Sequence, residues 1–327
     1  DQESATQRHI TCLAAAIQTP SEGSAMAQET QREERPKKEI TAANVFPVLL
    51  TVALAWVYTW IVVSLHVVLP PPALTPIEEP PSTSPEQGLT NIAPYLNTII
   101  FIGFVAVGGI IVYLLTRRFP KSIKYLAAAL FGLSGFLILY LYGFMLIELF
   151  HVGVAQWMDR LLLPVSLLLA GLLMLMLWSK WGVLRVISAS LVGAGLGVYL
   201  GASMPPWTTV VFIVGISLYD IVAVYKGPLG RLAQLDLTAM RGFVVDFMDV
   251  FVGLGDIVFY SMLIAFSSID RSIDSWQFRP LAGVAATAGI LVGFGVTLLA
   301  LRKGGTAPAL PASLIIGLCL ALLTILL

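Results

Sequence analysis

Two aspartates, Asp220 and Asp256, lie inside stretches of sequence that are otherwise apolar enough to dissolve in lipid. A carboxylate in the hydrocarbon core of a membrane costs roughly 2.5 to 3.5 kcal/mol even on the most lenient insertion scale, so its presence there indicates a function. Asp220 lies six residues before Lys226, and Asp256 lies six residues after Val250, where the apolar stretches meet the polar segment between them. At a helical rise of about 1.5 Å per residue, both side chains are expected about 9 Å below the same membrane surface.

Two carboxylates at one depth could carry out acid–base chemistry. When such groups lie close together they cannot both be ionised without strong repulsion, and the pair tends to share one proton near neutral pH. The ionised partner can then take a proton from water while the protonated partner polarises a carbonyl group, as in aspartic proteases. The same carboxylates could instead relay protons or cations in a transporter, or form a structural pair. Their spacing alone leaves these alternatives open.

The composition indicates that much of the chain faces lipid. Of 327 residues, 57% are hydrophobic and 12% are charged, whereas soluble domains contain about 25% charged residues. Long apolar segments near the ~20 residues needed to cross a membrane are expected to be helices, because lipid offers no partner to free backbone groups. The sequence therefore predicts an all-α polytopic membrane protein with nine transmembrane helices, at about residues 43–69, 92–116, 124–150, 161–179, 183–203, 206–226, 250–268, 281–300 and 309–327.

The basic residues are distributed unevenly between the two sides of these segments. With the N-terminus in the cytoplasm, 16 of the 19 Lys and Arg residues fall on the cytoplasmic side, and only Arg160, Arg271 and Arg279 fall on the other. This bias follows the positive-inside rule, and an odd number of crossings then places the C-terminus outside. We expect an integral, multi-pass membrane protein, located in the cell membrane if the source is microbial.

Three regions are expected along the chain. Residues 1–42 form a polar N-terminal arm with too few large apolar residues for a core, and are expected to be disordered. Met26 opens a plausible native start, so residues 1–25 could be foreign to the natural chain. Residues 43–205 contain the first five helices and are expected to act as a scaffold. Residues 206–327 contain the remaining helices and both membrane aspartates.

Other classes of site are disfavoured by the sequence. The three histidines, His9, His66 and His151, are scattered, which excludes a zinc protease of the His-Glu-x-x-His type. We expect no metal and no organic cofactor. The formal net charge is zero and no basic block occurs beyond the N-terminal arm, so nothing suggests a nucleic-acid partner.

The residues around the two aspartates narrow the alternatives. They form three short motifs, in the sixth, seventh and ninth apolar segments: Tyr219-Asp220, Gly253-Leu254-Gly255-Asp256 and Pro308-Ala309-Leu310. In this order and at these positions, the motifs resemble the presenilin and signal peptide peptidase family of intramembrane aspartyl proteases. The resemblance covers about residues 206–327, while the first five helices match only in number and topology. The orientation and the proline after the third motif resemble the presenilin branch.

The resemblance implies a presenilin-like helix bundle and a role for each matching residue. Asp220 and Asp256 would be the catalytic pair, Tyr219, Gly253, Leu254 and Gly255 would support the active site, and Pro308, Ala309 and Leu310 would bind substrate. The glycines would also let a substrate backbone or a helix approach Asp256, and the proline would interrupt regular helix. Substrates would be single-pass transmembrane proteins, cleaved within their membrane segments.

The connection between the sixth and seventh segments departs from the presenilin pattern. It is short, whereas presenilins carry a long loop there that they cleave during maturation. The sequence is therefore more similar to a stand-alone microbial or archaeal homologue, with no obligatory partner subunits, and a homo-oligomer remains open. The rival interpretation is a proton- or cation-coupled transporter or channel. It is disfavoured because the acidic motif occurs once, whereas transporters commonly repeat such features in two halves.

Overall fold

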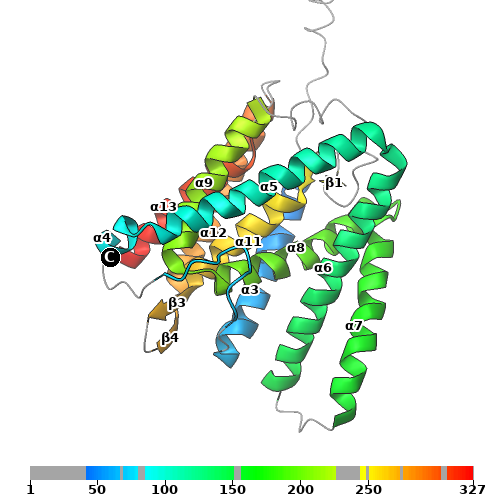
Figure 1. The fold of residues 1–327 in the computed structure, drawn as a ribbon, viewed down its shortest axis with the longest axis horizontal. Coiled ribbons are helices and arrows are strands. Elements are labelled where there is room, and N and C mark those ends of the chain that lie inside the picture. The colour runs from blue at the N-terminus through cyan, green and yellow to red at the C-terminus, as the bar shows by residue number, and fades with distance from the viewer. Residues whose placement is uncertain are drawn as a thin grey trace, which may run out of the picture.

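The computed structural model describes residues 42–66, 69–79, 85–150, 156–225, 244–247, 250–272, 275–302 and 308–326. Helices dominate this part of the chain (Figure 1). The predictions for the N-terminal arm, residues 1–42, lie outside the described residues, apart from Ala42. In chain order the elements are η1 (Ala42–Val45), α3 (Phe46–Leu65), α4 (Pro85–Thr90), α5 (Ala93–Arg118), α6 (Pro120–Leu149), α7 (Gln156–Leu177), α8 (Gly182–Ser203), α9 (Pro206–Tyr225), β1 (Val244–Phe247), β2 (Val250–Gly253), α11 (Leu254–Ser268), β3 (Ile269–Ser272), β4 (Ser275–Phe278), α12 (Pro280–Arg302) and α13 (Leu310–Leu326).

The helices coincide with the apolar segments of the sequence. Seven helices in the described residues are long and apolar enough to cross a membrane: α3, α5, α6, α7, α8, α9 and α12. The two other apolar segments contain α11, with 15 residues, and α13, with 17. The protein is thus an integral, multi-pass membrane protein, and nine crossings remain a prediction.

The seventh segment is not helical from its start, so the prediction for its first residues was wrong. Residues Val250–Gly253 form strand β2, which pairs antiparallel with β1. Two β-branched valines favour an extended backbone here, and Gly253 is itself extended with φ −68° and ψ 140°. The expected depth of 9 Å for Asp256 assumed helical rise over these residues and therefore does not apply.

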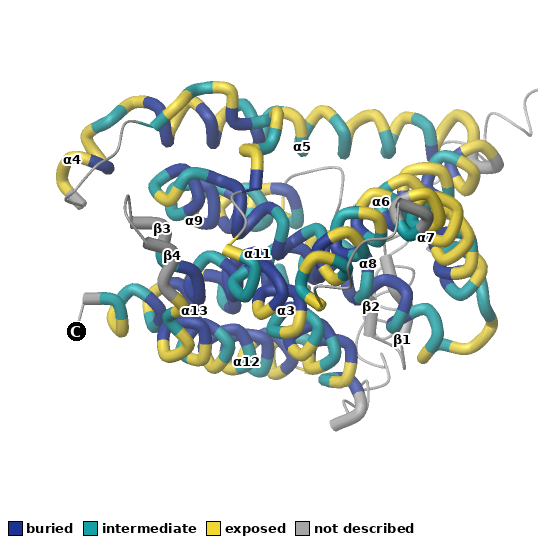
Figure 2. The backbone as a smooth tube through the Cα atoms, turned by 90° about the horizontal axis from the view of Figure 1, so that it is seen from below, coloured by how far each residue is buried: buried dark blue, intermediate teal, exposed yellow. Residues whose placement is uncertain are grey.

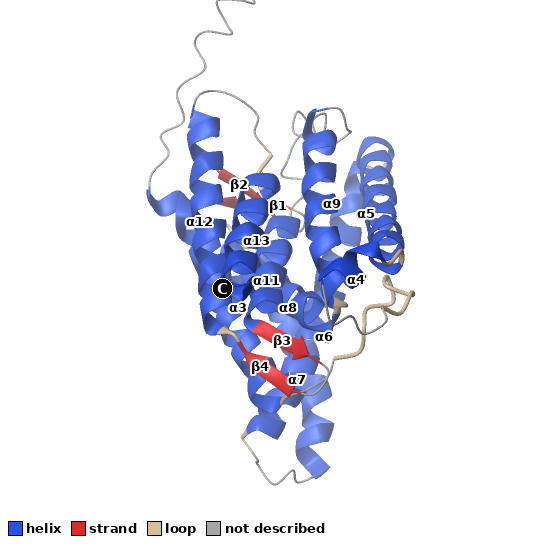
Figure 3. Cartoon of the chain, turned by 90° about the vertical axis from the view of Figure 1, so that its left-hand side faces the viewer, coloured by secondary structure: helices blue, strands red, loops and turns tan. Residues whose placement is uncertain are grey.

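A second hairpin, β3–β4, follows α11 directly, so the fold is not purely helical in the described residues. Figure 3 shows the two hairpins at opposite ends of α11. The α11 helix is consequently a short helix bounded by extended chain on both sides.

The α11 helix lies in the interior of the bundle and contacts α3, α8, α12 and α13 (Figure 2). Tyr260, Met262, Leu263 and Ile264 on this helix are at most 1% exposed. One hydrophobic core joins residues from both the 43–205 and 206–327 regions. The helix that holds Asp256 is therefore positioned largely by the helices expected to act as scaffold.

Glycines on α8 allow α11 to approach closely. A Cβ on Gly197 would lie 3.0 Å from the backbone nitrogen of Met262, and one on Gly201 would lie 3.0 Å from the Cβ of Ala265. Backbone atoms of α11 lie opposite these two glycines. A side chain at either glycine could therefore not be accommodated by a rotamer change on α11.

The segment before α5 is bonded to the start of α9. The Glu79 carboxylate accepts hydrogen bonds from the backbone N–H groups of Trp207 (3.2 Å) and Thr208, in the first turn of the helix. The Asn97 side chain bonds both the N–H and the C=O of Ile77 and reaches the Thr208 hydroxyl. The carboxylate satisfies N–H groups that have no partner within the helix and lies at the positive end of the helix dipole.

We expect Glu79→Gln to lower the free energy of unfolding by about 0.5 to 1 kcal/mol, because the amide keeps one acceptor but loses the charge at the helix terminus. Thermal unfolding in detergent measures the effect. The matched control is Glu78→Gln, which removes the charge of the neighbouring, exposed carboxylate. Equal melting temperatures for the two variants would contradict the capping role.

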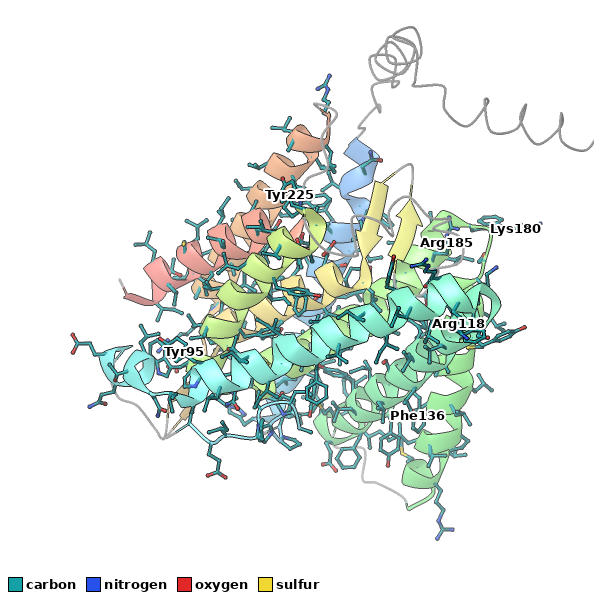
Figure 4. The ribbon with its side chains drawn as sticks, turned by 45° about the horizontal axis from the view of Figure 1, so that its top comes forward. Tyr95, Arg118, Phe136, Lys180, Arg185 and Tyr225 are labelled. Atoms are coloured by element: carbon teal, nitrogen blue, oxygen red, sulfur yellow. The ribbon has the colours of Figure 1, made fainter. Side chains whose placement is uncertain are left out.

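Several basic residues lie at one end of the molecule. Figure 4 shows Arg118, Lys180 and Arg185 near the end where β1 and β2 lie, while Tyr95 lies at the other end of α5. All three belong to the group that the sequence assigns to the cytoplasmic side. The arrangement agrees with a single basic face.

Candidate active site

Asp220 lies on α9, five residues before the helix ends at Tyr225. Its side chain is half-buried, and its Oδ2 accepts a hydrogen bond from the backbone N–H of Leu310, at 3.4 Å. This N–H belongs to the first residue of α13, where the helix itself supplies no acceptor. The contact therefore ties one of the two acids to the start of the last helix.

Asp256 is the third residue of α11 and lies close behind strand β2. Its Oδ2 accepts a hydrogen bond from the backbone N–H of Gly253, at 3.2 Å. An acidic side chain at this position closes the first turn of a helix and suits the helix dipole. The strand-to-helix junction thus fixes the direction of the Asp256 carboxylate.

The two glycines of the second motif leave room around Asp256. A Cβ on Gly253 would lie 3.4 Å from Oδ2 of Asp256, in ordinary van der Waals contact, and would fill the space beside the carboxylate. Gly255 is exposed, and a Cβ on it would meet only the edge of Phe259, at 3.7 Å. The backbone beside Asp256 is therefore accessible to another chain.

The other two residues expected to support the site face neighbouring helices. Leu254 packs against α8, where a Cβ on Gly193 would lie 3.2 Å from its Cδ1. The Tyr219 hydroxyl points toward α5, where a Cβ on Gly109 would lie 3.8 Å from it. Both side chains contribute to the helix contacts that hold the site.

The Pro308-Ala309-Leu310 segment lies between α9 and α11. Pro308 and Ala309 precede α13 and are half-buried, whereas Leu310 begins the helix and is buried. The Ala309 carbonyl accepts a hydrogen bond from the Tyr260 hydroxyl of α11, at 3.3 Å. The Leu310 N–H donates to Asp220 of α9. The segment is thus bonded to both helices that hold the aspartates.

The fold brings all three motifs together. Asp220 and Asp256 lie on α9 and α11, which contact each other, and the Pro-Ala-Leu segment bonds to both helices. In the described residues, no group of three or more histidine, cysteine or acidic side chains could hold a metal ion. The arrangement can perform proton transfer between two carboxylates and a bound water molecule.

Sequence reasoning missed two residues of this cluster, Tyr260 and Ser313. Tyr260 lies four residues after Asp256, on the same face of α11, and Ser313 lies three residues after Leu310. The spacing of Tyr260 from Asp256 was a usable signal, because a buried tyrosine hydroxyl needs a partner. The sequence around Ser313 contains no comparable indication of a role in the site.

Neither a protein-family model nor a curated protein matches this sequence. Among solved structures, a presenilin family intramembrane aspartate protease aligns with 86% of this chain and 100% of its own, at 19% identity and a TM-score of 0.55. The chain has a presenilin-like fold. In this presenilin-like protein the two membrane aspartates come from neighbouring helices, α9 and α11, and the Pro-Ala-Leu segment contacts both helices.

Proposed function

We propose that this protein is an intramembrane aspartic endopeptidase in which Asp220 and Asp256 form the catalytic pair. The observation that carries the proposal is the position of these two carboxylates on the contacting helices α9 and α11, within a presenilin-like fold. Each carboxylate is oriented by one backbone N–H, from Leu310 and Gly253 respectively. Both supporting bonds come from residues of the three motifs.

The mechanism uses one proton shared by the pair. The ionised aspartate removes a proton from water, and the oxygen of that water adds to the substrate carbonyl, which the protonated aspartate polarises. A gem-diol forms without a covalent bond to the enzyme. Its collapse breaks the C–N bond as a proton passes to the leaving nitrogen, and the pair returns to its starting state. No metal or organic cofactor takes part.

The substrates in this proposal are single-pass transmembrane proteins. A substrate helix hides its peptide groups in its own hydrogen bonds, so several residues must unwind before cleavage. The extended chain could then pair with backbone near the Pro308-Ala309-Leu310 segment or with the connection between α9 and α11. Gly255 has no side chain that would obstruct such a chain beside Asp256.

A substrate with helix-weakening residues near its cytoplasmic end should therefore be cleaved faster than one with leucines at the same positions. Glycine costs a helix about 1 kcal/mol per residue relative to good helix formers, so two glycines are expected to raise the rate roughly thirtyfold. Paired peptides that differ only at these positions, assayed under kcat/KM conditions, measure the ratio. Equal rates would contradict rate-limiting unwinding.

The proposed topology has nine crossings, with the N-terminus cytoplasmic and the C-terminus outside. The basic residues at one end of the molecule support this orientation (Figure 4). We also propose that the protein works without obligatory partner subunits, alone or as a homo-oligomer, in the cell membrane of a microbial source.

The deciding experiment incubates the purified protein with fluorescently labelled transmembrane peptides, in detergent and in liposomes. Mass spectrometry of the products locates the cleaved bond. Cleavage within the membrane segment that requires both aspartates supports the proposal. If no peptide is cleaved, and proton or sodium flux into the liposomes depends on the same two residues, the protein is a transporter instead.

A further inference from the structure

We propose that Tyr260 is a positioning residue that sets the geometry of the aspartate pair through a single peptide group. This inference rests on the proposed function, because it assigns Tyr260 a role in the same reaction. Tyr260 and Asp220 bond opposite ends of the peptide that joins Ala309 to Leu310.

The Ala309 carbonyl and the Leu310 N–H are the two ends of one rigid, planar peptide group. The carbonyl accepts from the Tyr260 hydroxyl of α11, at 3.3 Å, and the N–H donates to Oδ2 of Asp220 on α9, at 3.4 Å. A rotation of this peptide that weakens one bond therefore also displaces the other. The peptide is a direct link between α11 and the Asp220 carboxylate.

Tyr260 is suited to this role by its place on α11. It follows Asp256 by four residues, about one helical turn, so both side chains project from one face of the same helix. The residue is 1% exposed and is packed in the core, so the hydroxyl has little freedom to move. Tyr260 thus links the orientation of Asp220 to the helix that also holds Asp256.

Ser313 supports the same carbonyl from inside α13. Its hydroxyl donates a hydrogen bond to the Ala309 oxygen, at 3.4 Å. The Ala309 oxygen consequently has two neighbouring hydroxyl groups in a buried setting. Loss of the tyrosine hydroxyl would weaken the orientation of the peptide without leaving its oxygen wholly unsatisfied.

The test variant is Tyr260→Phe, which removes the hydroxyl and keeps the ring. Net loss of one neutral hydrogen bond corresponds to roughly a two- to tenfold change in rate, and we expect it as a fall in kcat with little change in KM. The double variant Tyr260→Phe/Ser313→Ala removes both hydroxyl groups from the carbonyl and is expected to lower kcat further than either single variant.

The matched control is Tyr142→Phe. The Tyr142 hydroxyl donates to the Gly195 carbonyl, at 3.1 Å, between α6 and α8, and the residue is 3% exposed. The control removes the same kind of buried tyrosine–carbonyl bond at a place away from the aspartates. A purely structural effect would lower the melting temperature of both variants and leave kcat of both near that of the parent.

A second readout does not depend on activity. Hydrogen–deuterium exchange over residues 308–314 reports how well the Leu310 N–H is held, and Tyr260→Phe should accelerate exchange there while Tyr142→Phe should not. If the parent cleaves peptides and Tyr260→Phe leaves kcat unchanged, the positioning role is overturned. If the parent cleaves no peptide, the proposed function has failed, and the exchange rates alone decide whether Tyr260 orients Asp220 through this peptide.

Discussion

Asp220→Asn and Asp256→Asn are each expected to reduce cleavage of a transmembrane peptide by roughly a thousandfold or more, because acid–base catalysis by positioned side chains contributes about 10²- to 10⁴-fold and the two aspartates act as a unit. An amide can neither accept a proton from water nor deliver one to the leaving nitrogen. The initial rate of release of the labelled fragment measures the loss.

Asparagine is preferred to alanine because of the backbone bonds at each site. Its side-chain oxygen can still accept from the Leu310 N–H at position 220 and from the Gly253 N–H at position 256. The fold of each variant should therefore be retained, and melting temperature checks this directly. The control Glu86→Gln removes an exposed carboxylate on α4 and should cleave like the parent. Cleavage that survives in either aspartate variant would refute the paired mechanism.

Gly293→Ala is expected to impair both folding and cleavage. A Cβ at this position on α12 would lie 2.5 Å from the carbonyl carbon and oxygen of Ala312, and would also overlap Ser313 Cα. These atoms are backbone of the first turn of α13, so the helix must shift away from α12. We expect a loss of about 1 to 3 kcal/mol in unfolding free energy from overpacking. Because Leu310 begins the same turn, cleavage should fall by roughly tenfold or more through displacement of its contact with Asp220.

Gly295→Ala provides the matched control on the same helix, because a Cβ there would meet nothing within 4 Å. Melting temperature and cleavage rate are measured for both variants in the same detergent. Two variants that behave alike would mean that α12 and α13 separate easily, and that the first turn of α13 does not need its observed position.

The candidate site stands out in the sequence because its residue types are rare in apolar segments. A charged residue in an apolar helix is costly, so Asp220 and Asp256 stand out from the amino-acid order by itself. The helical segments are predictable because their length and hydropathy follow the thickness of a membrane. These are local properties, and they need no knowledge of which helices are neighbours.

The features that escape prediction depend on contacts between distant segments. The β1–β2 hairpin converts four residues before α11 into strand, and their apolar character is equally compatible with helix. The role of Tyr260 depends on Ala309, 49 residues further along the chain. Likewise, the bond from Glu79 to the start of α9 spans more than a hundred residues. Such pairings follow from the packing of the bundle, which periodicity in one segment does not reveal.

The length of α11 also has a consequence for how water reaches the site. A helix of 15 residues rises only about 22 Å, whereas the hydrocarbon layer is about 30 Å thick. Because α11 lies inside the bundle, the extended chain at its two ends must be covered by other parts of the protein or reached by water, since lipid satisfies no polar backbone group. Asp256 lies in the first turn of this short helix, next to β2. Water therefore has to reach only one end of this short helix to hydrate Asp256, and no pore through the whole bundle is needed.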